Sequence, residues 1–165
     1  MKGESKINLF GIELLKEDAE LAKFDRSELC KKIEQIVHLV NEESSSTPLI
    51  SELNVVITDP VSIKELNNQF RSKDEPTDVL SFAGENNLTS ELYICPEYIV
   101  KRLQEEGLLE KISLKEEFFR MIVHGCLHLI GFDHENHFEW DSSSAYNGSE
   151  QIYLKQEEIL KNILN

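Results

Sequence analysis

Three histidines in the C-terminal half of the chain have the spacing of ligands to one metal ion. His124, His128 and His134 follow the pattern H-x3-H-x5-H, with Gly131 between the second and the third. On a helix, positions i and i+4 lie about 40° apart around the axis, so His124 and His128 project from one face. A glycine can end a helix in the left-handed conformation and turn the chain back, which brings His134 toward the same point. The spacing therefore predicts a metal site with three imidazole ligands.

The ion that this pattern favours is zinc, one per chain, because neutral imidazole is among the preferred ligands of zinc. Three protein ligands leave a tetrahedral ion one open position, which is typical of catalytic zinc. A fourth histidine, His137, would close the site. Cys126 lies about 200° from His124 around the helix, so we expect it to point away from the ion. The predicted site is therefore that of a zinc hydrolase.

The residue after the first histidine limits the chemistry. Zinc peptidases with the pattern H-E-x-x-H-x-x-G-x-x-H have a glutamate there as the general base. This chain has Gly125 instead. Peptide hydrolysis by that mechanism is not expected. A metallopeptidase or amidohydrolase that uses another carboxylate as its base stays open as an alternative.

Two segments resemble a known family. The run from His124 to His134, HGCLHLIGFDH, resembles the signature of the YbeY family of bacterial endoribonucleases. Residues 66–82 resemble the second hallmark of that family, with Arg71 and the run PTDVLSF at 76–82 matching position by position. The resemblance implies a single-domain, metal-dependent endoribonuclease specific for single-stranded RNA. It also implies a role in 3′-end maturation of 16S ribosomal RNA and in ribosome quality control, with the ribosome or small-subunit assembly proteins as partners.

Arg71 is the candidate for the cation that cleavage of a phosphodiester requires. A planar guanidinium can hold two phosphate oxygens at once. Spacing alone favours a surface arginine in an ion pair, and the resemblance reverses that preference. The carboxylate of Asp78 either orients a ligand histidine or completes a turn. Asp133, next to His134, either orients a ligand, accepts a proton or completes a turn. Glu91 departs from the family pattern.

Composition is that of a globular protein. The 165 residues are 40% hydrophobic and 29% charged, and we expect a single domain over residues 1–165. No run approaches the ~20 apolar residues that span a bilayer, and charged residues interrupt any N-terminal signal core. We therefore expect a cytoplasmic protein without a membrane partner. The three cysteines show no C-x-x-C pair and are expected to be reduced thiols.

The net charge of −14 is unusual for a protein that binds RNA. Either a local basic cleft coexists with an acidic exterior, or a protein partner on the ribosome supplies the targeting. The candidates for such a cleft are Lys64, Arg71, Lys73, Lys101, Arg102 and Arg120. On both interpretations, affinity for naked RNA should be weak and should fall steeply with salt. A non-catalytic ribosome-assembly factor, in which zinc only fastens the C-terminal loop, is a further alternative.

Apolar periodicity predicts the elements that position these residues. Strands are expected at residues 6–10, 53–58, 79–83 and 91–95. Helices are expected from 25 or 27 to about 40, at 59–70, at 96–106, from Ser113 through the histidines, and at 149–163. Residues 11–24 read as a polar connector after the first strand, and residues 41–48 as a loop. The predicted fold is α+β: a mixed sheet of about four strands surrounded by about five helices, one of them a histidine helix like that of zinc hydrolases.

Overall fold

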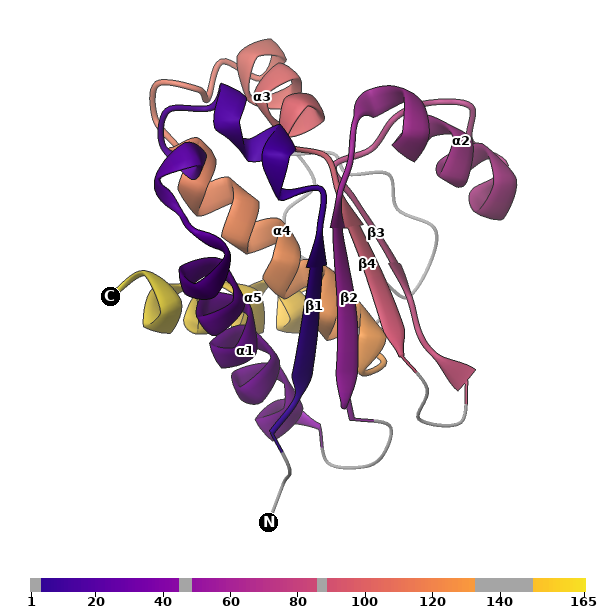
Figure 1. Ribbon diagram of the computed structural model, residues 1–165, viewed down its shortest axis with the longest axis vertical. Coiled ribbons are helices and arrows are strands. Elements are labelled where there is room, and N and C mark those ends of the chain that lie inside the picture. Colours follow the sequence, from indigo (N-terminus) through magenta and orange to yellow (C-terminus); the bar gives the residue numbers. More distant parts are fainter. Residues whose placement is uncertain (1–3, 45–48, 86–88, 133–149) are drawn as a thin grey trace.

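The computed structural model describes residues 4–44, 49–85, 89–132 and 150–165. These residues form an α+β fold built on one four-stranded mixed sheet (Figure 1). The strands are β1 (Lys6–Phe10), β2 (Glu52–Ile57), β3 (Val79–Phe82) and β4 (Ser90–Ile94), in the spatial order β1-β2-β4-β3. The first three in that order are parallel, and β3 runs antiparallel to β4. The predicted fold class is confirmed.

The described part of the chain has five α-helices. They are α1 (Arg26–Glu43), α2 (Pro60–Arg71), α3 (Pro96–Glu105), α4 (Leu114–Leu129) and α5 (Glu150–Leu164). Short polar side chains begin three of them: Asp25, Asp59 and Ser113 each accept a hydrogen bond from the backbone N–H three residues on. Within the described residues, no helix is both long enough and apolar enough to cross a membrane.

Helices lie on both faces of the sheet (Figure 1). Helices α1 and α4 pack on one face, and α5 packs against both of them. Helix α2 lies over the other face, where Ile63 meets Leu80 and Cys95 in a small second cluster. The main core lies between the sheet and α4, and its strand side chains alternate along each strand, as Val55 and Leu92 do in their paired register.

Helix α4 approaches the sheet closely at Gly125. A Cβ atom at this position would lie 2.6 Å from Leu92 Cδ1 and 3.3 Å from Val79 Cγ2. The glycine therefore faces β3 and β4, and any side chain there would enter the packed core. Because α4 is buried along most of its length, it is the rigid element on which His124 and His128 are carried.

Two expectations about local structure are wrong. Helix α1 does not end near residue 40 but continues to Glu43, because the buried Asn41 side chain exchanges two 2.9 Å hydrogen bonds with the backbone of Ile50. The segment after β1 is not a featureless connector but forms two 3₁₀ helices, Ile12–Glu17 and Leu21–Lys23, which bury Leu15 and Leu21. In both cases a contact distant in sequence sets the local structure.

Candidate metal centre

The first two predicted ligands face each other near the C-terminal end of α4. The Nε2 atoms of His124 and His128 lie 2.9 Å apart, with the ring planes at 78°. Two nitrogens that bind one tetrahedral zinc at about 2.0–2.1 Å are separated by roughly 3.3 Å. A small increase in the distance between the two Nε2 atoms would therefore let both bind one ion. Two imidazole donors placed in this way can contribute to one metal site.

The remaining nitrogen of the His124 ring contacts α5. His124 Nδ1 lies 2.8 Å from Oε1 of Gln156, whose side chain is buried. An amide oxygen only accepts hydrogen bonds, so Nδ1 carries the proton and Nε2 keeps its lone pair. Tyr153, one turn earlier on α5, stacks on the same ring with 6.3 Å between centroids. The ring of His124 is thus held in the tautomer that a metal ligand needs.

Gln156 is not among the residues that the sequence predicts for the site. Its signal was a polar residue inside the apolar stripe of the last helix, between Ile152 and Ile159, where a buried side chain was expected. A buried polar group in such a stripe requires a partner, and here the partner is a candidate ligand.

Several predicted site residues lie outside the described part of the chain: His134, Asp133 and His137. Among the residues that the structure describes, no group of three side chains that could hold a metal ion occurs. The third ligand therefore stays a prediction.

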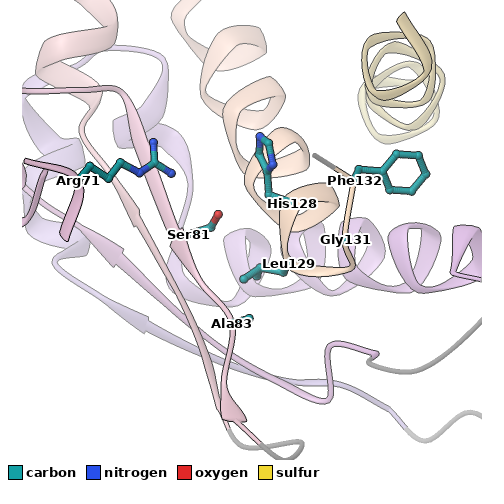
Figure 2. Close-up of a pocket in the computed structure, with 7 residues that line it drawn as sticks. All are labelled: Arg71, Ser81, Ala83, His128, Leu129, Gly131 and Phe132. Carbon is teal, nitrogen blue, oxygen red and sulfur yellow. The ribbon is translucent and has the colours of Figure 1, made fainter. Parts of the chain in front are cut away.

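A pocket of about 340 Å³ adjoins the histidine pair. Its lining includes Arg71 from the end of α2, Ser81 from β3 and His128 from α4. Figure 2 shows the Arg71 side chain pointing toward the side on which the His128 ring lies. The structure therefore brings Arg71 and His128, which belong to different sequence motifs, to one pocket.

The chain turn after α2 positions Arg71. Ser72 takes the left-handed conformation, with φ 56°, and its N–H bonds the carbonyl of Asn68. The buried Asn67 side chain donates to the carbonyl of Glu75 at 2.8 Å, which fixes the following loop. No carboxylate of the described residues lies within ion-pair distance of Arg71. Its guanidinium can therefore serve a ligand.

Most residues of the hypothesised basic cleft pair with carboxylates. Arg102 binds Asp78 at 3.0 Å and Glu117 at 2.6 Å. Burial lowers the pKa of Arg102, but the neighbouring carboxylates raise it by more, so the net pKa shift is upward and the guanidinium stays charged. Arg120 is paired in the same way, and Lys64 and Lys101 each lie 3.8 Å from a carboxylate. Of the six candidates, only Arg71 lines the pocket.

The structure places Asp78, Glu91 and Cys126. Asp78 accepts a hydrogen bond from Val79 N and pairs with Arg102 at 3.0 Å. Its action on a ligand histidine stays a prediction, because His134 lies outside the described residues. Glu91 accepts from the Tyr93 hydroxyl at 3.5 Å. Cys126 is fully buried, and desolvation raises the pKa of its thiol to about 12, which agrees with a side chain that points away from an ion.

The fold and the site together define an α+β protein whose core helix presents paired imidazoles beside an arginine-lined pocket. The model of the family described as Endoribonuclease YbeY matches residues 14–161. The chain belongs to this family.

Known proteins of this family resemble the chain at moderate identity. A relative from Pseudoalteromonas translucida, named Endoribonuclease YbeY, is 41% identical over 101 residues, which cover 56% of this chain and 64% of the relative. A relative of the same name from Persephonella marina is 32% identical over 146 residues, covering 84% and 86%. A solution structure of a protein from Thermotoga maritima matches with a TM-score of 0.54 at 26% identity, over 95% of this chain and 88% of that one.

Proposed function

We propose that this chain is a metal-dependent endoribonuclease that cleaves single-stranded RNA, with one Zn²⁺ held by His124, His128 and His134. The observation that carries the proposal is the pair of Nε2 atoms, 2.9 Å apart, beside a pocket lined by Arg71. The names of the relatives support the same activity. When bound, zinc supplies a Lewis acid and lowers the pKa of a water toward about 7.

The residues of the pocket supply the rest of the chemistry. The Arg71 guanidinium donates to the non-bridging oxygens of the scissile phosphate and offsets the negative charge that develops during attack. His124 and His128 act as neutral ligands that leave one side of the site open to the pocket. The Ser81 hydroxyl, which also lines the pocket, is a further donor for the RNA backbone.

The position of Gly125 argues against the peptidase alternative. In zinc peptidases the residue after the first histidine is the general-base glutamate. Here that position faces the sheet, where even a Cβ would lie 2.6 Å from Leu92 Cδ1. A glutamate side chain would not fit at this position unless Leu92 moved. The proposed reaction therefore uses no base at this position.

The charge distribution favours a protein partner as the source of targeting. The net charge is −14, and Arg102 and Arg120 are occupied by carboxylates. We therefore propose that a partner on the ribosome supplies the targeting. The family resemblance implies that the chain, as one RNase domain over residues 1–165, acts in the cytoplasm on the 3′ end of 16S ribosomal RNA. The acidic net charge also favours a second candidate function, a non-catalytic assembly factor with structural zinc.

The test is cleavage by the purified protein of a single-stranded ribosomal RNA fragment and of a peptide mixture, each with and without a chelator. We expect RNA to be cut, the chelator to stop cleavage, and added zinc to restore it, while peptides stay intact. Intact RNA in the presence of zinc-loaded protein would favour the assembly factor. Chelator-sensitive cleavage of peptides would overturn the proposal.

Replacing Arg71 by alanine is expected to lower kcat/KM for RNA by about 10²–10³-fold, the usual effect of removing one donor to a developing oxyanion. Zinc content should not change, because Arg71 is not a ligand. Arg71→Lys should recover part of the loss, since it keeps the charge without the planar fork.

The matched control for this variant is Arg26→Ala. Arg26 begins α1, outside the pocket, and donates to the carbonyl of Leu9 at 2.5 Å. Arg26→Ala removes the same charge from the chain as Arg71→Ala. Because Arg26 lies outside the pocket, this variant should cleave RNA at a rate near that of the unmodified protein. Equal losses in both variants would mean that Arg71 acts only through overall charge.

A further inference from the structure

Helix α5 contacts the candidate metal centre through one buried amide. Gln156 is 2% exposed, and its Oε1 lies 2.8 Å from Nδ1 of His124 on α4. From this geometry we propose that Gln156 is a positioning residue, which sets the tautomer and ring orientation of His124 for metal binding. The inference rests on the metal site of the proposed function and names a residue that controls it.

The orientation of the amide follows from its second contact. Gln156 Nε2 donates to Oε1 of Glu157 at 3.2 Å, and a carboxylate oxygen can only accept. The amide oxygen must therefore be the atom that faces His124. This arrangement fixes the proton on Nδ1 and directs the lone pair of Nε2 toward His128, where the ion would lie.

An arginine anchors the segment of α5 that carries Gln156. Arg120, one turn before His124 on α4, donates from Nε to Glu157 Oε1 at 2.7 Å. It also donates to Glu116 and Glu117 on its own helix. Arg120 thus ties α5 to α4 next to Gln156, which precedes Glu157 in the chain.

The acceptor on His124 is a neutral amide, which has a chemical consequence. A hydrogen-bond acceptor on the far nitrogen of a ligand histidine orients the ring and raises its basicity, and a carboxylate does so more strongly than an amide. Gln156 therefore orients the ligand while it leaves the ion more electron-poor than a carboxylate would. The loss of such an outer partner typically costs about 10–100-fold in metal affinity.

The test compares two replacements of similar shape. Gln156→Met keeps the length of the side chain but has no strong acceptor, and Gln156→Glu keeps an acceptor. Zinc affinity is measured by competition with a chromogenic chelator. We expect Gln156→Met to bind zinc about 10–100-fold more weakly, and Gln156→Glu to bind at least as tightly as the unmodified protein. Gln151→Met, at an exposed position of the same helix, is the matched control and should bind normally.

A second measurement does not depend on metal. In the apo protein, ¹⁵N chemical shifts of the histidine rings report which nitrogen is protonated. We expect one Nδ1–H tautomer for His124 in the unmodified protein and a tautomer mixture in Gln156→Met. If the unmodified protein binds no zinc but shows this difference, the metal site fails and the positioning role stands.

Two results would overturn the positioning role itself: unchanged zinc affinity in Gln156→Met, or the same tautomer mixture in the unmodified protein and the variant. If Gln156→Met does not fold, Glu157→Gln takes its place, because the Glu157 side chain is 52% exposed. Loosening the anchor should then weaken zinc binding by less than the loss of Gln156 itself, and no weakening would count against the proposal.

Discussion

A protein in which alanine replaces His128 is expected to lose tight zinc binding and RNA cleavage while it keeps its fold. The Nε2 atom of this ring is one of the two that face each other at 2.9 Å. Its loss removes a direct ligand, so affinity should fall by more than roughly 100-fold, the upper end for losing an outer hydrogen-bond partner. The ring lines an open pocket, so its truncation leaves no closed cavity in the core.

Zinc content after dialysis, the thermal unfolding midpoint and the rate of RNA cleavage measure the three parts of this expectation. The matched control is His38→Ala on α1, where the side chain is 68% exposed and lies 3.5 Å from a surface carboxylate, Glu42. That variant should keep both zinc and activity. Normal zinc content and cleavage in His128→Ala would place the reaction elsewhere in the molecule.

The sequence allowed the strands, the helices and the common face of His124 and His128 to be predicted, because these depend on local periodicity. The alternation of β2 and the i, i+4 spacing on α4 are visible within one element. The approach of Arg71 to His128 depends on how α2 and α4 are placed around β3. No local pattern encodes that placement, and only the resemblance of two separate motifs pointed to it.

The pairing of charges could not be predicted for the same reason. Arg102 and Arg120 are cations and were therefore candidates for a basic cleft. In the folded chain, carboxylates from α4 and α5 pair with them. Gln156 likewise gains its role only when α5 packs on α4. Contacts between elements distant in sequence thus decide which polar residues serve structure and which remain available to a ligand.

One carboxylate joins both of these arginines. Glu117 on α4 is 3% exposed, and its two oxygens lie 2.6 Å from Arg102 Nη2 and 2.5 Å from Arg120 Nη1. Through Arg102 it ties α3 to α4, and through Arg120 it adjoins the contact with α5. Neither arginine side chain is more than 13% exposed, so water cannot replace the carboxylate at low cost.

Glu117→Gln should therefore lower the free energy of unfolding by about 1.5–3 kcal/mol, because two buried guanidinium groups lose a charged partner while each keeps other carboxylates. For a chain of this length that corresponds to a fall of roughly 3–12 °C in Tm. Urea unfolding of Glu117→Gln and of Glu105→Gln, whose carboxylate is 67% exposed beside Lys101, provides the measurement. Loss of the exposed pair in Glu105→Gln should lower the free energy of unfolding by less than about 1 kcal/mol.

Zinc affinity should change little in Glu117→Gln, since Arg120 keeps its contacts with Glu116 and Glu157. Similar losses of stability in the two variants would mean that the charge network is not a principal source of stability between α3 and α4.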